Sequence, residues 1–236
     1  MLFWRDHSVT FAFRAQYLQI RTMDIAHLRK EYTKDGLSEE AMPGEPLNLF
    51  KLWFDQAIAA QILEPNAMSL ATVAADNMPN MRTVLLKFYD AAGFVFFTNY
   101  TSQKAQELSA NPHASILFPW LALERQVKIQ GTVERIANRE SLKYFMTRPF
   151  GSQLGAWVSH QSQVISSRKI LEMKLAEMKQ KFADGKVPLP SFWGGYRLVP
   201  RNYEFWQGRA NRLHDRIAYT RHAADPSAWQ INRLAP

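Results

Sequence analysis

The chain has 236 residues, of which 47% are hydrophobic and 21% are charged, a composition typical of globular proteins rather than of disordered or coiled-coil ones. Its 29 Lys and Arg against 21 Asp and Glu give a net charge of +8, which predicts an anionic partner such as nucleic acid, a membrane surface or a phosphorylated small molecule. The lack of cysteine excludes disulfides, thiolate catalysis and cysteine-ligated metals, and the six histidines show no ligand spacing, so no metal site is expected.

Residues 1–22 mix aromatic and arginine side chains with a single acidic residue. Three interpretations compete: an organelle presequence, a disordered tail, or upstream sequence from a wrongly chosen start codon, with Met23 as the true first residue. We favour the last, because well-patterned sequence follows Met23 directly, and we expect one domain over residues 23–236. No apolar run approaches the roughly 20 residues that a membrane helix needs, so we also expect a soluble, cytoplasmic protein.

Apolar residues recur at helical spacing over residues 47–62, between Pro46 and Pro65, which predicts a first amphipathic helix. Short apolar runs between turn residues then predict strands, and their hairpin spacing implies antiparallel pairing. The later elements that these patterns predict are strands at 67–74, 81–88 and 94–98, a helix at 102–110, strands at 113–119 and 124–136, a helix that Asn138 caps and Pro149 ends, a helix at 164–182, and strands near 196–199, 203–207, 212–220 and 229–233.

The expected strand at 124–136 alternates between two faces, with Val127, Ile129, Gly131 and Val133 on one and Gln126, Lys128, Gln130 and Thr132 on the other. About eight short antiparallel strands are expected, with helices only in the connections. A closed or split barrel protects sheet edges better than an open sheet does. The sequence therefore predicts a mainly β protein with α-helices, built as an antiparallel barrel.

Arg212, His214 and Arg216 would share one face if residues 212–220 form a strand. Two guanidiniums and an imidazole repel one another unless something anionic or electron-rich lies over them, which favours a ligand site. The alternative is a solvated edge face with unrelated charges. The tryptophan-containing segment at 204–208, just upstream, favours the ligand site.

Two further groups of residues have the chemistry of phosphate binding. Residues 98–104 leave a strand and enter a helix, which gathers backbone amides, a Ser or Thr cap and Lys104, although an ordinary N-cap would look the same. Tyr144 and Arg148 lie four residues apart on one helix face with Ser152 just beyond, and the alternative there is a surface Tyr–Arg pair. Arg82 and Lys87 end an apolar strand, where a cation is kept only beside water or an anion.

The sequence lacks the glycine-rich nucleotide motifs, the nucleophile elbow and the zinc-protease motif, which disfavours nicotinamide folds, nucleotide hydrolases, serine hydrolases and zinc proteases. Several strings taken together resemble the pyridoxine (pyridoxamine) 5′-phosphate oxidase family over about residues 27–236. They are HLRKEY at 27–32, RTVLLK at 82–87, ERQV at 124–127, GAWVS at 155–159, PLPSFWGG at 188–195, EFWQG at 204–208, RLHDR at 212–216 and RLAP at 233–236. The later strings are highly specific because they occur in order and at family-like spacing.

The resemblance implies an FMN-binding split barrel that acts as a homodimer, with each flavin held between subunits. It implies that Arg82 and Lys104, with Gln103 beside them, lie at the FMN phosphate, and that the flavin is lined by Thr83, Val84, Leu85, Leu86, Lys87, Phe97, Thr98, Gln126, Gln161, Ser162, Trp206 and Arg216. The substrate phosphate would be bound by Lys87, Tyr144, Arg148 and Ser152. The catalytic residues Arg212 and His214 would face the pyridine ring, under a flexible cover made of Arg29, Lys30, Glu31 and Tyr32.

Two positions depart from the family pattern. Gln103 stands where the family commonly has Arg, and a charge-assisted hydrogen bond is worth about 1.5–3 kcal/mol against about 0.5–1.5 for a neutral one, so a roughly tenfold loss of FMN affinity is expected if nothing compensates. Phe97 stands where Tyr is frequent, which costs at most one hydroxyl contact.

The reaction implied by the resemblance moves a hydride from C4′ of pyridoxine or pyridoxamine 5′-phosphate to the flavin, giving pyridoxal 5′-phosphate, after which O2 reoxidises the flavin and yields H2O2. The sequence does not identify the base that takes the substrate proton: reference pKa values disfavour Arg212 and leave His214 as a candidate. Three rivals remain: another FMN split-barrel oxidoreductase such as a flavin reductase, a basic nucleic-acid-binding barrel, and a non-catalytic pyridoxal-phosphate carrier. The second anion site argues against the first, and cations confined to strand ends and helix starts argue against the second.

Overall fold

The computed structural model describes residues 31–32, 36–38, 42–159, 161–222, 225 and 227–236. Residues 32–236 form one compact unit. The expected extension at 1–22, together with Arg29 and Lys30, lies outside the described residues. No helix in the described part of the chain has the length and apolar character needed to cross a bilayer.

Nine strands and five α-helices lie within the described residues. Their bounds are α1 Pro46–Ala59, β1 Ala67–Val73, β2 Pro79–Leu85, β3 Phe88–Asp90, β4 Gly93–Asn99, α2 Gln103–Ala110, β5 His113–Trp120, β6 Arg125–Arg135, α3 Asn138–Thr147, α4 Phe150–Val158, α5 Arg168–Lys181, β7 Trp193–Gln207, β8 Asp215–Arg221 and β9 Trp229–Leu234. Short 3₁₀ turns cover Leu121–Leu123 and Ala210–Arg212.

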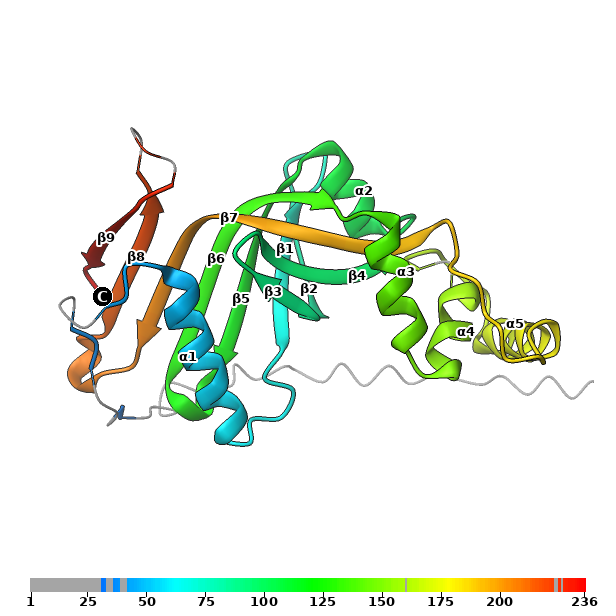
Figure 1. Cartoon of the computed structure of the whole chain (residues 1–236), viewed down its shortest axis with the longest axis horizontal. Helices are drawn as coiled ribbons and strands as arrows, with labels where there is room; N and C mark the ends of the chain where they lie inside the picture. Colours follow the sequence, from blue (N-terminus) through cyan, green and yellow to red (C-terminus); the bar gives the residue numbers. More distant parts are fainter. Residues whose placement is uncertain (1–30, 33–35, 39–41, 160, 223–224, 226) are drawn as a thin grey trace, which may run out of the picture. The chain divides into compact units, whose positions relative to one another are not determined.

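All strand pairs are antiparallel, as the hairpin spacing predicted, and the main sheet has the order β2-β1-β5-β6-β7-β4-β3. Strand β7 pairs with β6 along one side. On its other side, its first half pairs with β4 and its second half with β8, which in turn pairs with β9. Figure 1 shows helices α3, α4 and α5 near one end of β7, and strands β8 and β9 at its other end. The sheet curls around one core, which agrees with the expected antiparallel barrel class.

The core fills the inner face of this sheet, and α1 covers it. Phe50 and Trp53 of α1 are 0% and 2% exposed, and Phe50 packs edge-on against Phe94 and Phe118, with ring centroids 4.9 and 5.1 Å apart. In β6 the residues Val127, Ile129, Gly131 and Val133 are buried and alternate with more exposed ones, as predicted. The inner face is thus filled by aliphatic and aromatic groups, and polar ligands have to bind at the outer face or at the strand ends.

Strand β7 is one strand of 15 residues, although the sequence predicted two separated by Pro200. Proline lacks the N–H that a strand ladder needs, so a continuous strand through Pro200 needs an irregularity at this point. The structure keeps the strand continuous through a bulge: Gln130 of β6 faces Asn202 and Gly131 faces Pro200, so Arg201 is the extra residue. The continuous strand links the two ends of the sheet.

Three other boundaries differ from prediction. The expected strand at 81–88 is interrupted between β2 and β3, and Lys87 lies in the gap, where its N–H donates to the Val95 carbonyl at 2.9 Å. Ala137, rather than Asn138, holds the N-cap position of α3, and its N–H donates to the Glu140 carboxylate at 3.2 Å. The helix expected at 164–182 begins only at Arg168.

Helix α4 was not predicted at all. Pro149 ends α3, as expected, but it also occupies the N-cap position of α4. The segment carries Gly151 and Gly155, which lower helix propensity, so its apolar run did not read as a helix. Burial of Leu154, Ala156 and Val158 stabilises it instead.

The strand expected at 212–220 begins only at Asp215, so the prediction that Arg212, His214 and Arg216 share one strand face was wrong. Arg212 ends a 3₁₀ turn and has φ +61°, a left-handed conformation that a strand cannot contain. Tight turning at Asn211 and Arg212 connects β7 to β8 within a few residues. Alternation cannot be read across such a turn, because its residues do not follow the period of two.

Gly131 at the bulge offers a test of the fold. A Cβ there would lie 2.0 Å from the backbone carbonyl oxygen of Val199. We expect Gly131→Ala to lower the free energy of unfolding by on the order of 2 kcal/mol, because backbone atoms cannot move aside as a side chain can. Urea denaturation measures the change. Gly151→Ala in α4 is the control, since no atom lies within 4 Å of its added methyl group, and equal losses in both variants would contradict the close approach.

Candidate active site

A cavity of about 650 Å³ lies where β2, β4, α2, α3, α4 and the start of β7 meet. Eleven of the residues singled out from the sequence line it, namely Thr83, Val84, Leu85, Lys87, Phe97, Thr98, Lys104, Tyr144, Arg148, Ser152 and Gln161. Three of these are cations, and no Asp or Glu is among the lining residues. The three positive charges repel one another, and an anion bound between them would reduce that repulsion. The cavity therefore attracts anions.

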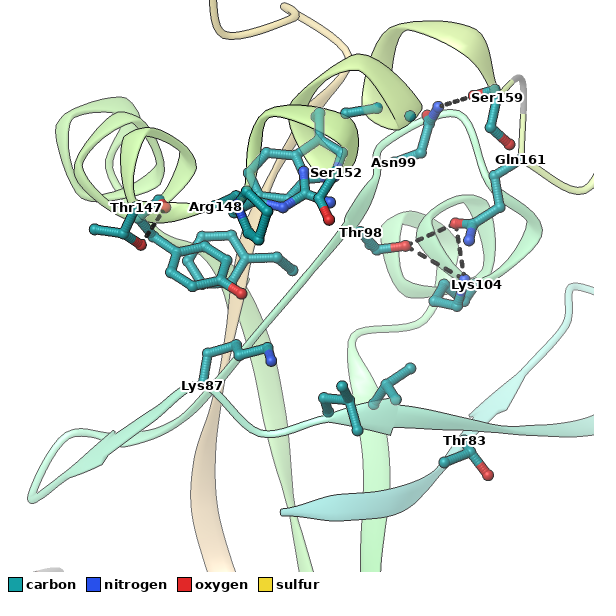
Figure 2. Close-up of a pocket in the computed structure, with 18 residues that line it drawn as sticks. Thr83, Lys87, Thr98, Asn99, Lys104, Thr147, Arg148, Ser152, Ser159 and Gln161 are labelled. Carbon is teal, nitrogen blue, oxygen red and sulfur yellow. Dashed lines mark hydrogen bonds between the residues drawn. The ribbon is translucent and has the colours of Figure 1, made fainter. Parts of the chain in front are cut away.

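Lys104 marks one side of the cavity. Its side chain is 7% exposed, and its ammonium donates to the Gln161 Oε1 at 3.0 Å and to the Thr98 Oγ1 at 3.3 Å (Figure 2). Burial, with a smaller contribution from Arg82, lowers the pKa of Lys104 to about 8. The lowered pKa shows that this cation lacks sufficient compensation from the residues around it.

Arg82 does not line the cavity. Because side chains alternate along β2, Arg82 points to the face opposite Thr83, where its Nη2 donates to the buried carboxylate of Glu107 at 2.9 Å and its Nη1 donates to Thr72. Burial alone would raise the pKa of Glu107, but hydrogen bonds from Thr72, Asn80 and Arg82 outweigh it and hold that pKa below its usual value. Glu107 was not singled out from the sequence, since a single acid in a helix carries no signal.

Lys87, Arg148 and Ser152 lie on the other side of the cavity (Figure 2), and Tyr144 of α3 also lines it. The Nη1 atom of Arg148 is buried and has no hydrogen-bond partner among the described residues. Burial lowers the pKa of Arg148. A buried donor without an acceptor is costly, so this atom points to an anionic or polar ligand.

Three aromatic rings are stacked beside these groups. The Phe97 ring lies 4.1 Å from the Tyr144 ring and 5.2 Å from the Trp193 ring, with interplanar angles of 27° and 12°. Gly195 allows this stack, since a Cβ there would lie 2.9 Å from the Phe97 ring. The sequence string containing Trp193 contributed to the family resemblance, but its place in the cavity wall was not foreseen.

A second cluster lies at the far end of β7. The Tyr32 ring contacts the rings of Trp206 and His214 at centroid distances of 5.6 and 5.4 Å, and Trp206 and His214 lie 4.7 Å apart. The Arg209 N–H donates to the His214 Nδ1 at 3.1 Å, which leaves Nε2 to carry the proton of the neutral ring. Gln126 and Arg216 flank Trp206 on the neighbouring strands.

Arg216 in this cluster is held by a carboxylate. Its Nε donates to Glu204 at 2.9 Å, and its Nη1 donates to the Ala235 carbonyl at 2.7 Å. Glu204 also pairs with Lys128 at 2.5 Å. Burial alone would raise the pKa of Glu204, but the hydrogen bonds from Arg216 and Lys128 keep it below its usual value.

The remaining candidates lie apart from the cavity wall. Leu86 is a core residue, 4% exposed, and the Gln103 N–H donates to the Ser162 Oγ at 3.2 Å at the start of α2. Arg212 lies in the turn before β8, and Glu31 belongs to no helix or strand. Arg29 and Lys30 are outside the described residues.

Strand β7 sets the separation of the two clusters. Gly195 pairs with Phe97 at the cavity, and Trp206 pairs with Gln126 and Arg216 at the other end. At about 3.3 Å per residue, these positions lie roughly 35 Å apart along the strand. The cavity and the second cluster therefore lie toward opposite ends of β7, with α3 and α4 near one end and β8 at the other (Figure 1).

Two family models match the chain. Residues 54–182 match the model described as pyridoxamine 5′-phosphate oxidase, and residues 193–236 match the pyridoxine 5′-phosphate oxidase C-terminal dimerisation region. Curated relatives described as pyridoxine/pyridoxamine 5′-phosphate oxidase include one from Crocosphaera subtropica, 59% identical over 91% of this chain and 100% of the relative, and one from Aliarcobacter butzleri, 58% identical with the same coverage.

Solved structures with this fold include PhzG from Burkholderia lata in complex with tetrahydrophenazine-1-carboxylic acid. It has a TM-score of 0.79 and 33% identity, over 86% of this chain and 98% of that one. A pyridoxamine 5′-phosphate oxidase-related, FMN-binding protein from Nostoc punctiforme has a TM-score of 0.66 and 16% identity, over 83% of this chain and 100% of that one, and shows the fold alone. The antiparallel sheet described above is therefore a split barrel, as predicted.

The buried charge of Lys104 yields a testable consequence for stability. A lysine whose pKa is about 8 in the folded state and about 10.5 in the unfolded state makes the protein more stable as the pH rises through that interval, because the unfolded chain then binds more protons. We expect Lys104→Met to stabilise the ligand-free protein by about 2 kcal/mol at pH 7, and by clearly less at pH 9.5. Urea denaturation at both pH values measures this.

Lys143→Met is the matched control, since Lys143 is an exposed residue of α3 and should have little effect at either pH. A loss of stability in Lys104→Met at pH 7 would contradict the uncompensated burial of this cation.

Proposed function

This chain belongs to the pyridoxine/pyridoxamine 5′-phosphate oxidase family, and from that premise we propose how its cavity carries out the family's reaction. The chain oxidises pyridoxine 5′-phosphate or pyridoxamine 5′-phosphate to pyridoxal 5′-phosphate. We propose FMN as the cofactor and O2 as the electron acceptor. The observation that carries the proposal is the cavity wall with three cations, no carboxylate and a buried, unpartnered Arg148 Nη1.

The residues present fit a phosphorylated flavin. Lys104 has a charge that the protein does not compensate, and Thr98 and Gln161 lie at hydrogen-bond distance from its ammonium. These three residues would bind the FMN phosphate, supported by Arg82 through the Glu107 network. The strand residues 83–85 and Phe97 would lie along the flavin ring. FMN, when bound, would supply a hydride acceptor next to the substrate and return the electrons to O2 with release of H2O2.

The second cation group fits the phosphate of the substrate. Arg148 has free N–H donors, Lys87 adds a second positive charge, and the hydroxyls of Tyr144 and Ser152 add hydrogen-bonding groups. Two separate cation groups in one cavity match a reaction in which two phosphorylated aromatic molecules bind side by side. Holding both in place supplies much of the rate enhancement, because it removes the entropy cost of bringing them together.

We propose that the second cluster acts on the cavity of a partner subunit. Trp206, Arg212, His214 and Arg216 lie toward the opposite end of β7 from the cavity of their own chain, after up to roughly 35 Å of strand. In a twofold dimer, each subunit can present this cluster to the cavity of the other, and residues 193–236 match a region described as a dimerisation region. The assembly is then a homodimer with two shared sites. Each site is formed by the cavity of one subunit and the second cluster of the other.

In the shared site, Arg212 and His214 would orient the pyridine ring and Arg216 would stabilise negative charge on the flavin. Because His214 Nδ1 accepts the Arg209 N–H, its Nε2 is the atom that can hold or move a proton at the substrate. Tyr32 packs against both Trp206 and His214, so it is placed to cover bound substrate and exclude water.

Removing the unpartnered cation tests the substrate site. We expect Arg148→Met to raise the KM for pyridoxine 5′-phosphate by roughly 10- to 100-fold, because a charge-assisted hydrogen bond is worth about 1.5–3 kcal/mol, while FMN content stays unchanged. Peroxide formation by FMN-loaded enzyme gives KM and kcat. Arg139→Met, at the solvent-exposed start of α3, is the control. An unchanged KM in Arg148→Met would remove this residue from the substrate site.

Mixing two inactive variants tests the shared site. Arg148→Met impairs the cavity and Arg212→Ala impairs the second cluster, so each homodimer should lose at least about tenfold in kcat/KM. Subunits reassociated at random from a 1:1 mixture should regain about one quarter of wild-type activity, because half of the dimers carry one intact site. Activity no higher than the mean of the two homodimers would show that both residues serve a site within one chain.

A further inference from the structure

Arg148 differs from the described arginines that are held by a carboxylate. Arg82, Arg197 and Arg216 each pair with a carboxylate at 2.7 to 2.9 Å. Among the described residues, the Arg148 guanidinium makes no ion pair and no hydrogen bond, and its Nη1 is buried. A half-buried guanidinium without a counterion needs some other contact to keep it in one place, since an arginine side chain loses about 2 kcal/mol of conformational entropy when it is fixed.

The contact is made by aromatic faces. The Arg148 Cζ lies 4.6 Å from the centroid of the Trp193 ring and 5.7 Å from that of Phe145. A cation over an aromatic face is attracted by the negative charge density of the ring, most strongly for Trp. Trp193 is thus the closer and the better of the two partners.

Trp193 is itself held firmly. The side chain is 8% exposed, lies in a cluster with Phe145 and Ala156, and stacks on Phe97 with an interplanar angle of 12°. Its backbone N–H donates to the Pro190 carbonyl at 3.1 Å, which fixes the main chain from which the indole projects at the start of β7. The indole is therefore a fixed platform rather than a mobile neighbour of the arginine.

We propose that Trp193 is the positioning residue for the substrate phosphate, and that it acts through Arg148. This inference rests on the proposed function, in which Arg148 binds that phosphate. A carboxylate in place of Trp193 would also hold the guanidinium, but it would offset the positive charge and occupy the N–H groups. An aromatic face holds the flat side of the guanidinium and leaves all of its N–H donors, which point outward in the plane, free for a phosphate.

The test compares Trp193→Phe with Trp193→Leu in the FMN-loaded, full-length enzyme. Both variants lose side-chain volume, but only Trp193→Phe keeps an aromatic face. A cation–π contact of about 0.5–2 kcal/mol corresponds to a 2- to 30-fold change. We expect Trp193→Leu to raise the KM for pyridoxine 5′-phosphate about tenfold with kcat changed less than about threefold, and Trp193→Phe to stay within about threefold of wild type in both.

Inorganic phosphate provides a second measurement. As a competitive inhibitor of FMN-loaded enzyme, it probes the phosphate group alone, without the pyridine ring. Its inhibition constant should rise in Trp193→Leu and not in Trp193→Phe. Trp193→Met has about the volume of Leu but a flexible, unbranched side chain that fills irregular gaps more easily. It is measured in parallel, and it should show the same rise in KM even if Trp193→Leu does not fold.

A double-mutant cycle decides whether Trp193 acts through Arg148. In an Arg148→Met background, Trp193→Leu or Trp193→Met should raise KM no further. Equal effects of Phe and the aliphatic residues, an additional KM increase in the Arg148→Met background, or an unchanged KM in the aliphatic variants would each overturn the inference while leaving the proposed function intact. If Arg148→Met alone leaves KM unchanged, the substrate site of the proposed function fails first, and this inference fails with it.

Discussion

The burial of cations around one cavity without a carboxylate in its wall is the interaction on which the site depends. Lys104 and Arg148 both lose hydration there, and the protein supplies only neutral partners, Thr98 and Gln161 for the ammonium and aromatic rings for the guanidinium. On the opposite face of β2, by contrast, the buried Glu107 is paired with Arg82. The cavity therefore favours anionic groups, and in the proposed function two phosphates supply them.

The neutral partners have a chemical consequence. Because no Asp or Glu lines the cavity, no resident carboxylate has to be displaced from Lys104 or Arg148 before a phosphate binds. Glu107, on the Arg82 face, offsets the charge of Lys104 only in part. The stacked rings of Tyr144, Phe97 and Trp193 form a rigid support for the Arg148 guanidinium, which an ion pair would otherwise hold in position. Rigid apolar support and free polar donors are the combination that a preorganised binding site requires.

Strand β7 runs from this cavity to the second cluster around Trp206. Its bulge at Arg201 keeps 15 residues in one ladder despite Pro200, so Trp193 begins the strand at the cavity and Trp206 lies near its other end. The same continuity places the Trp206 cluster toward the opposite end of β7 from the cavity of its own chain, and in the proposed dimer this cluster completes the cavity of the partner. A strand that separates two halves of a site gives an enzyme a physical reason to be a dimer.

Much of this could be predicted from the sequence. Period-two alternation in β6 and helical spacing in α1 identified the core, and the specific strings at 188–195, 204–208 and 212–216 identified the family, because local patterning and short motifs are properties of adjacent residues. Other features depended on contacts between distant residues: the helix α4, stabilised by burial, the turn that removes Arg212 from a strand face, the Glu107 partner of Arg82, and the placement of Trp193 against Arg148. Burial, pairing and long-range stacking arise only when segments far apart in the chain pack together, and no local pattern encodes which segments meet.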